Sequence, residues 1–244
     1  MEKILKFKSG GLMGDFINSL YVVKNICINQ EAKADLYINN GGEAFRYGID
    51  KAYNDLYDIV MLQPYINTFS IDNNINNNDS ISLYDWRSQV QHDFNNGGYN
   101  KSWSELLSNY YCFDVPNEYK WVYILDTDVN YSNATIIHMS NRRRNPKFDT
   151  ENYILNNGID NVVFLITNEN DLYIDGYDKV VVDDIYKMAL ILNSCKYFIG
   201  NQSMPLALAS SLDVPRLAVL DLDFNNYMFY KGEPNYSKNI DVFI

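Results

Sequence analysis

Short runs of apolar residues alternate with longer amphipathic segments along most of the chain. The first run, at residues 3–8, alternates charged and apolar positions, and residues 16–28 then carry apolar side chains close to helical spacing. The same alternation of strand-like and helix-like segments returns after residue 133. Strands that alternate with helices are typical of βαβ units, so the pattern predicts an α/β fold with parallel sheets.

The first half of the chain is predicted to begin with the strand at 3–8 and the helix at 16–28. Further elements are expected as strands at 35–38 and 58–62, a short helix at 42–47 and a helix at 102–112. Ser102 and Glu105 have the spacing of a capping box at the start of that last helix. The polar run 72–80 is predicted to be a surface loop, and residues 116–133 a crossover to the second half.

The second half shows a more regular alternation. Strands are expected at 134–139, 162–167, 179–182, 197–200 and 216–220, with helices at 149–157, 184–194 and 203–212. The pattern predicts two Rossmann-like domains, residues 1–128 and 129–244, that face each other across a cleft. In such sheets ligands bind at the carboxyl ends of the strands, so the loops that follow the strands should line this cleft.

Composition and charge exclude several classes of protein. The formal net charge of −11 over 244 residues argues against binding to nucleic acid or to an anionic membrane. No apolar run approaches the ~20 residues of a membrane span, and the N-terminus lacks the apolar core of a signal peptide, so we expect a soluble, cytoplasmic protein. The 21 tyrosines could stack on sugars or simply fill cores.

The cysteines and histidines do not form a recognisable metal site. Cys27, Cys112 and Cys195 are far apart in the sequence, and the first and last lie in apolar helical patterns typical of buried, reduced thiols. Two histidines are too few for a histidine-based site. We therefore predict neither a metal nor a cofactor.

The first candidate site is the glycine-rich turn Gly10-Gly11-Leu12-Met13-Gly14-Asp15, between a predicted strand and a predicted helix. Such a turn brings backbone N–H groups and the positive end of a helix towards an anion or a hydroxyl. It lacks the Gly-Lys-Ser/Thr of a P-loop. Asp15 has two interpretations: a general base at the cleft, or a carboxylate that caps the helix.

The second candidate is a basic stretch that follows the strand at 134–139. Three arginines and a lysine, Arg142, Arg143, Arg144 and Lys147, come directly after this strand in an otherwise acidic chain. Arginine can hold phosphate oxygens with two parallel hydrogen bonds, so the stretch is a candidate diphosphate site, and a solvated basic loop is the alternative. His138 is interpreted as a hydrogen-bonded residue at the strand end or as a ligand contact.

The third candidate follows the strand at 197–200. Asn201, Gln202, Ser203 and Met204 lead into a helix of small residues, with Ser203 at the expected N-cap position. Small residues let a helix pack close to a sheet, and the N–H groups of its first turn can bind a pyrophosphate.

Taken in order, these segments resemble the ADP-heptose:lipopolysaccharide heptosyltransferase family of the GT-B glycosyltransferases. The resemblance rests on Gly14-Asp15, Ser19-Leu20 and Val23-Lys24, on the strand that ends in Ile137-His138, and on the segment from Phe198 to Pro215. It spans nearly the whole chain through short motifs. Where the family has Asp-Thr/Ser-Gly followed by His, this chain has Gln202, Ser203, Met204 and Ala207.

The resemblance implies an inverting, metal-independent transfer of a sugar from a nucleoside-diphosphate sugar to a glycan or other hydroxyl acceptor. Residues 1–128 would form the acceptor domain and 129–244 the donor domain, with Asp15 as the base. The donor and phosphate-binding residues would be Gly11, Gly14, His138, Ser140, Arg142, Arg143, Arg144, Lys147, Asn201, Gln202, Ser203 and Met204. The alternative is a non-catalytic GT-B-like protein that binds a nucleotide or a glycan. An epimerase on the same plan would need a set of cleft carboxylates that the sequence does not supply.

Overall fold

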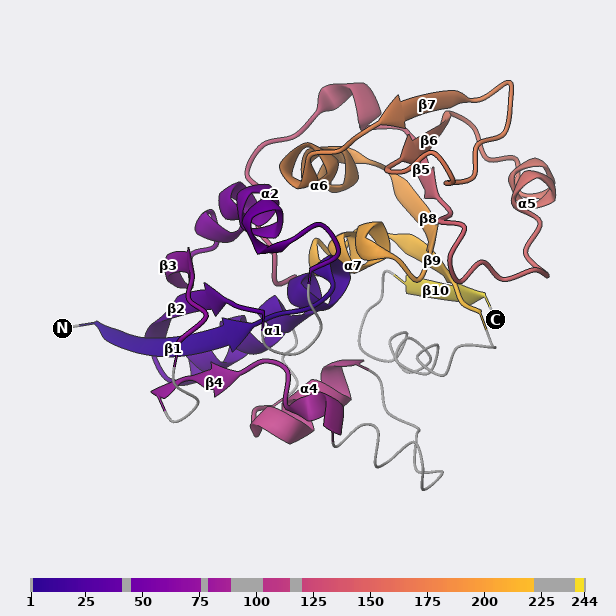
Figure 1. Ribbon diagram of the computed structural model, residues 1–244. Coiled ribbons are helices and arrows are strands. Elements are labelled where there is room, and N and C mark those ends of the chain that lie inside the picture. Colours follow the sequence, from indigo (N-terminus) through magenta and orange to yellow (C-terminus); the bar gives the residue numbers. More distant parts are fainter. Residues whose placement is uncertain are drawn as a thin grey trace.

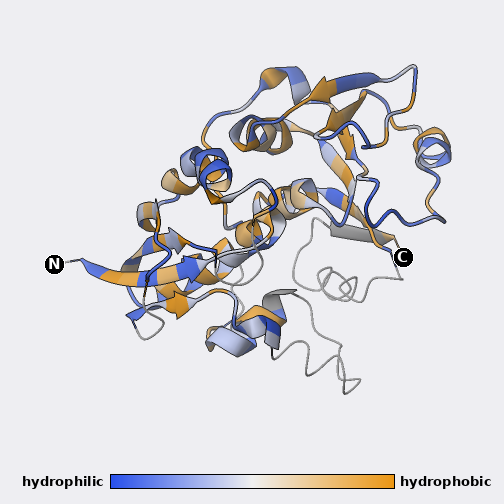
Figure 2. Cartoon of the chain, viewed as in Figure 1, coloured by the Kyte–Doolittle hydropathy of each residue, from blue (hydrophilic) through white to orange (hydrophobic). Residues whose placement is uncertain are grey.

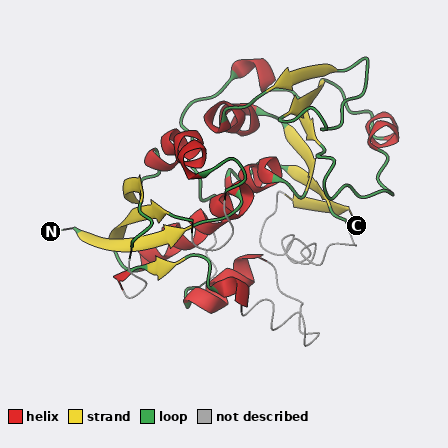
Figure 3. Cartoon of the chain, in the orientation of Figure 1, coloured by secondary structure: helices red, strands yellow, loops and turns green. Residues whose placement is uncertain are grey.

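The computed structural model describes residues 2–40, 45–75, 79–88, 103–114, 120–221 and 240–243. Within these residues the chain forms two sheets with helices packed against them (Figures 1 and 3). Each strand pairing in this part of the chain is parallel. The α/β fold with two parallel sheets is therefore as predicted.

The first sheet has the strand order β3-β2-β1-β4. Its strands are β1 (Lys3–Ser9), β2 (Ala32–Ile38), β3 (Ile66–Ile71) and β4 (Ile81–Ser82), and its helices are α1 (Met13–Asn29), α2 (Ile49–Met61) and α4 (Trp103–Tyr111). The chain runs outward from β1 through β2 to β3 and then returns to the other side of β1 as β4. The strand order thus reverses between β1 and β4, which is where ligands bind in open parallel sheets.

The second sheet has the strand order β10-β9-β8-β5-β6-β7. Its strands are β5 (Thr135–His138), β6 (Val162–Ile166), β7 (Asp178–Val181), β8 (Tyr197–Asn201), β9 (Arg216–Val219) and β10 (Ile240–Phe243). The helices are α5 (Thr150–Asn156), α6 (Ile185–Ser194) and α7 (Met204–Ser211), and a short 3₁₀ helix, Val129–Tyr131, precedes β5. Here the order reverses between β5 and β8, so the loops after these two strands flank the second reversal point.

The two halves share a hydrophobic core. One cluster of buried side chains extends from the first sheet through α1 to α7 and the second sheet, and a smaller one covers the other face of the second sheet. Figure 2 shows hydrophobic residues along α7 and the strands of both sheets. Helix α1 is buried at every position from Ile17 to Cys27 except Asn18, since it lies between its own sheet and α7.

Helices α1 and α7 come into contact near Gly14, where even a Cβ atom would make only an ordinary van der Waals contact. A Cβ atom built on Gly14 would lie 3.5 Å from the Cα atom of Met204. Beyond this contact, the backbone N–H of Trp121 donates to the carbonyl oxygen of Ser211 at 2.9 Å, and its indole Nε1 donates to that of Ile17 at 2.8 Å. The connecting segment therefore holds both helices.

Most predicted elements agree with the structure, but the first half contains two errors. The predicted strand at 58–62 is wrong, because Asp58 to Met61 form the last turn of α2. The buried residues Ala52, Leu56, Ile59 and Val60 recur at helical spacing, so the apolar run at 58–62 is the end of an amphipathic helix. The predicted helix at 42–47 is also wrong at residues 45–47, which form a turn, and residues 41–44 lie outside the described residues.

Some expected features cannot be compared. Ser102 of the predicted capping box, residues 76–78 of the polar loop and residues 116–119 of the crossover lie outside the described residues. Strands β3, β4 and β10 were not predicted. The first sheet lies within residues 3–82 and the second within residues 135–243, while the exact domain boundary at residue 128 stays a prediction. No helix in the described ranges is both long and apolar enough to cross a membrane.

Candidate functional site

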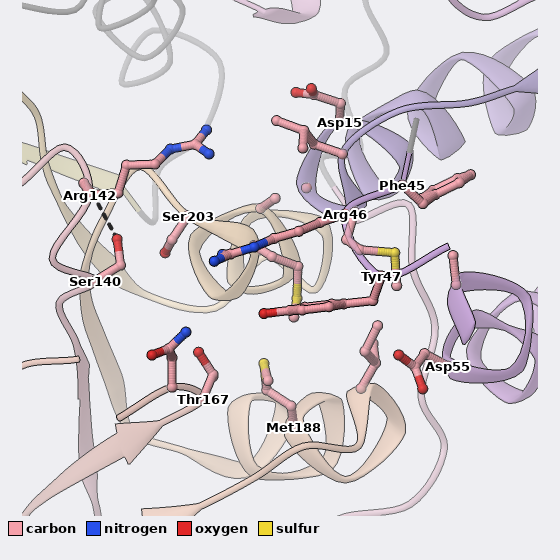
Figure 4. Close-up of a pocket in the computed structure, with 18 of the residues that line it drawn as sticks. Asp15, Phe45, Arg46, Tyr47, Asp55, Ser140, Arg142, Thr167, Met188 and Ser203 are labelled. Carbon is pink, nitrogen blue, oxygen red and sulfur yellow. Dashed lines mark hydrogen bonds between the residues drawn. The ribbon is translucent and has the colours of Figure 1, made fainter. Parts of the chain in front are cut away.

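A cavity of about 530 Å³ lies between the two halves. The first half lines it with the start of α1, the turn at 45–48 and part of α2, and the second half with the loops after β5, β6, β7 and β8 and the starts of α6 and α7. These segments follow the carboxyl ends of parallel strands. Figure 4 shows side chains from both halves pointing into it. The cleft predicted from the sequence pattern is thus present.

Asp15 lies in the first turn of α1 and lines the cavity. Its carboxylate forms an ion pair with the guanidinium of Arg87, which lies in a helical segment that follows β4. The Arg87 guanidinium also lies over the rings of Tyr84 and Trp86, with its carbon 4.8 and 5.3 Å from the ring centroids. The two aromatic rings and the carboxylate together fix the guanidinium, so Arg87 in turn restrains Asp15.

Gly11 makes this arrangement sterically possible. It has a φ of +98°, and a Cβ atom there would lie 1.6 Å from the hydroxyl oxygen of Tyr84. Gly11 is not among the residues that line the cavity and leaves room for the ring that supports Arg87, so its donor contact stays a prediction. Gly14 does line the cavity, beside Met204.

Asn201 organises the loop after β5 rather than lining the cavity. Its side-chain oxygen accepts from the backbone N–H of Ser140 at 3.0 Å and lies 3.2 Å from the Ser140 hydroxyl oxygen. Its amide nitrogen donates to the carbonyl oxygens of Ser140, Arg142 and Arg143 at 2.9–3.1 Å. Since the side chain is fully buried and its polar atoms are engaged, its role is to shape this loop.

The loop presents two of its three arginines to the cavity. Arg142 and Arg143 line it, and Arg143 has a φ of +64°, which turns the chain sharply at that point. The Ser140 hydroxyl donates to the carbonyl oxygen of Arg142 at 2.8 Å (Figure 4). Arg144 and Lys147 are exposed and lie outside the cavity lining, so their predicted donor contacts are not supported.

His138 is a buried residue of β5 with an exposed fraction of 1%. Its Nδ1 lies 3.0 Å from the carbonyl oxygen of Leu165 and 3.7 Å from a carboxylate oxygen of Asp171, and burial lowers the pKa of its imidazole. The same Asp171 oxygen accepts from the backbone N–H groups of Thr167 and Asn168. His138 is therefore a hydrogen-bonded residue at the strand end, the first of its two interpretations. His138 does not line the cavity, so the structure gives no support to a ligand contact.

Gln202 is buried to 94% and lines the cavity at the start of α7. Neither the oxygen nor the nitrogen of its side-chain amide has a hydrogen-bond partner among the described residues. An unsatisfied buried amide costs on the order of 1–3 kcal/mol, so a ligand that bonds to it would be favoured.

Ser203 occupies the predicted N-cap position of α7, but its side chain does not cap the helix. The Ser203 hydroxyl donates to the carbonyl oxygen of Asn201 at 2.9 Å instead. The N–H groups of the first helical turn are thus left without a side-chain cap beside Arg142 and Arg143. A helix start of this kind favours an anion.

Several residues that line the cavity were not identified from the sequence. They are Arg46, Tyr47, Lys51 and Asp55 in the first half and Thr167, Asn168, Asp183 and Met188 in the second. Each of these residues lies in the loop after β2, β6 or β7 or in the helix that follows that loop. The signal that could have identified them is therefore their place after a strand. Among the described residues, no group of three or more His, Cys, Asp or Glu side chains could hold a metal ion.

No family model and no curated protein match this sequence. The structure, in contrast, resembles solved glycosyltransferases. The dodecameric, iron-containing glycosyltransferase TibC from enterotoxigenic E. coli is 11% identical with a TM-score of 0.55 over 89% of this chain, which spans 58% of TibC. The E. coli heptosyltransferase WaaC with ADP-2-deoxy-2-fluoro heptose is 11% identical, with a TM-score of 0.53 over 100% of this chain and 93% of WaaC.

A third similar structure is E. coli ADP-heptose lps heptosyltransferase II, which is 12% identical with a TM-score of 0.52 over 99% of this chain and 90% of that enzyme. At identities this low the likeness establishes the fold. The resemblance predicted from the short sequence motifs is confirmed at that level: the chain has the GT-B-like fold of the heptosyltransferases.

Proposed function

We propose that the chain is a glycosyltransferase that moves a sugar from a nucleoside-diphosphate sugar to a glycan or other hydroxyl acceptor. One observation carries the proposal: a single cavity between the halves combines a carboxylate, Asp15, with an anion-favouring wall made of Arg142, Arg143 and the start of α7. Residues 129–244 would form the donor domain and residues 1–128 the acceptor domain.

The second half would hold the diphosphate. Arg142 and Arg143 supply positive charge within a chain of net charge −11, so the attraction for an anion is local rather than a property of the whole surface. The first-turn N–H groups of α7 and the buried amide of Gln202 would donate to phosphate oxygens.

The first half would supply the base. Asp15 and Arg142 lie on opposite sides of the cavity (Figure 4). The acceptor hydroxyl would attack the anomeric carbon from the Asp15 side and give its proton to that carboxylate. The bond to the diphosphate would break on the opposite side, which inverts the configuration. Arg142, Arg143 and α7 would stabilise the negative charge that develops on the leaving group, so the proposed step requires no metal.

The similar structures support the class of donor. WaaC has been solved with ADP and with an ADP-heptose analogue, and TibC with an ADP-heptose. Gln202, Met204 and Ala207 depart from the acid and histidine of the family pattern, so the proposal names no donor sugar. The cytoplasmic location also stays a prediction.

A non-catalytic nucleotide- or glycan-binding protein is the second candidate. The ion pair between Asp15 and Arg87 favours it, because a carboxylate already paired with a guanidinium is a weaker base. Release of nucleoside diphosphate in the presence of an acceptor separates the two candidates: a binding protein forms the complex without turnover.

The test begins with thermal unfolding of the full chain in the presence of UDP, GDP and ADP sugars. At least one sugar nucleotide should raise the midpoint, and Arg142→Gln or Arg143→Gln should reduce that rise. Arg144→Gln is the matched control, since it removes the same charge from the same segment outside the cavity. No stabilisation by any of these nucleotides, or equal effects of all three variants, would contradict the proposed donor site. Turnover that persists in EDTA supports the absence of a required metal.

A further inference from the structure

The turn at residues 45–48 projects two side chains into the cavity. Phe45 is buried in the core of the first half, and its carbonyl oxygen accepts from the backbone N–H of Gly48 at 3.0 Å. Gly48 has a φ of +87° and immediately precedes α2. Both ends of the turn are therefore fixed, and its two central residues, Arg46 and Tyr47, line the cavity.

Tyr47 presents an aromatic ring to the cavity. The residue is 67% exposed, although it lines a cavity between the halves. The guanidinium carbon of Arg46 lies 5.3 Å from the centroid of the ring. In Figure 4, Arg46 is on one side of Tyr47 and Met188 of α6 is on the other. The guanidinium holds the ring on one side, which leaves the side towards Met188 for a ligand.

The wall towards Met188 has an apolar part, with Asn168 and Asp183 also among its lining residues. Val182, Ile185 and Met188 line this part of the cavity, and Thr167 lies at its end after β6. An aromatic ring on one side and the apolar part of this wall on the other form a site suited to a flat, weakly polar group. A nucleobase is such a group, and its face can stack on an aromatic side chain whatever the base.

The order of groups along the cavity matches the order of groups in a nucleotide sugar. Figure 4 shows Asp15 at one end, Ser203 at the start of α7 in the middle, and Tyr47 with Met188 towards the other end. If the reacting sugar lies beside Asp15 and the diphosphate beside α7, the nucleoside lies between Tyr47 and α6.

We propose that Tyr47 stacks on the nucleobase of the donor, so that the first half completes a nucleoside site otherwise built from the second half. Arg46 orients the ring. The inference rests on the proposed function and adds to it a residue that recognises the base. Binding of the nucleoside then depends on both halves of the chain.

The test compares ligands with and without a base by titration calorimetry on the full chain. The ligands are UDP, ADP, GDP and CDP, with inorganic pyrophosphate as the ligand without a base. Tyr47→Leu should weaken nucleoside diphosphate binding about tenfold or more, and should leave pyrophosphate binding within twofold of the original. Tyr47→Phe, which keeps the ring, should bind both like the original chain. Tyr57→Leu is the control, because Tyr57 is exposed on α2 but does not line the cavity.

The outcomes separate this inference from the proposed function. In one outcome the original chain binds nucleoside diphosphates, Arg142→Gln weakens this binding and Tyr47→Leu does not. Stacking by Tyr47 is then overturned, and the donor site stands. Equal weakening of pyrophosphate and nucleoside diphosphates by Tyr47→Leu also overturns it, because the ring would then not act through the base. If the original chain binds none of the four nucleotides, the proposed function fails and this inference fails with it.

Discussion

Arg87 reaches from the helical segment after β4 to pair with Asp15 in the first turn of α1. The two residues flank the point where the strand order of the first sheet reverses, between β1 and β4. Since the guanidinium also packs over Tyr84 and Trp86, the carboxylate is restrained by a side chain that is itself restrained.

Asp15→Asn should abolish most of the turnover while leaving nucleotide binding intact. General base catalysis contributes typically ~10²–10⁴-fold, so kcat should fall by at least about a hundredfold. The measurement is release of nucleoside diphosphate with an acceptor, alongside nucleotide affinity. Arg87→Gln should lower kcat less, because the carboxylate remains and loses only the cation that restrains it. Unchanged turnover in Asp15→Asn would show that this carboxylate is not the base.

Gly11→Ala should destabilise the fold more than an alanine at another glycine of similar φ. At Gly11 the new Cβ meets the Tyr84 hydroxyl, whereas at Gly176, with a φ of +95°, nothing lies within 4 Å. Gly176→Ala should therefore lower the free energy of unfolding only by the backbone strain, about 1 kcal/mol, and Gly11→Ala by roughly 1–3 kcal/mol more. Urea unfolding provides the measurement. Tyr84→Leu in the Gly11→Ala background should recover part of the loss, and equal losses at the two glycines would contradict this account.

Asn201→Ala should loosen the loop that carries Arg142 and Arg143. It removes the hydrogen bonds that join β8 to this loop and leaves partly buried carbonyl groups without this partner, so the free energy of unfolding should fall by on the order of 1–3 kcal/mol. Nucleotide affinity should fall as well, since the arginines lose their support. Asn141→Ala, at an exposed position of the same loop, serves as the control and should change neither quantity.

His138 should make the fold sensitive to mild acid. Burial lowers the pKa of its imidazole below the usual ~6.5, so the unfolded state binds a proton more readily than the folded state. Its contribution to stability is thus fully present above pH ~6.5 and is lost as the pH falls below that value, at up to about 1.4 kcal/mol per pH unit. Urea unfolding at pH 7.5 and 5.5 should show a smaller loss for His138→Gln than for the original chain. An identical pH dependence would rule out this contribution.

The three cysteines should differ in reactivity. Cys112 is exposed, whereas Cys27 and Cys195 are buried and burial raises the pKa of each thiol to about 12. Because the thiolate is the reactive form, iodoacetamide at pH 8 should label Cys112 rapidly and the other two only after unfolding. Peptide mass spectrometry reads out each site, and rapid labelling of Cys195 in the folded chain would contradict its burial.

The sequence pattern predicted the second half better than the first for a physical reason. Strands such as β5 and β8 are buried on both faces and appear as short continuous apolar runs, which are easy to locate. In the first sheet β3 is an edge strand that carries Asn67 and Thr68, so it lacks such a run. The apolar residues at the end of α2 therefore resemble a strand. With a strand predicted there, the sequence does not predict that the turn at 45–48 lines the cavity.

The sequence predicted where the candidate site lies better than it predicted which residues line it. Asp15, Arg142, Arg143, Gln202 and Ser203 line the cavity as expected from their positions after strands. The sequence could not separate Asn201, which bonds to the backbone of the neighbouring loop, from Gln202 beside it. Nor could it place Arg87, which meets Asp15 only because β4 returns beside β1. Such contacts depend on the order of strands in the sheet.

The close packing of α1 against α7 has a consequence for how the molecule folds. A core that passes continuously from one sheet to the other leaves neither half with a complete interior of its own. We expect a single cooperative unfolding transition, and fragments cut near residue 128 to aggregate when expressed alone and to recover solubility when expressed together. Exchanging halves between relatives of this chain would then succeed only when the helix pair Met13–Asn29 and Met204–Ser211 is exchanged as a unit.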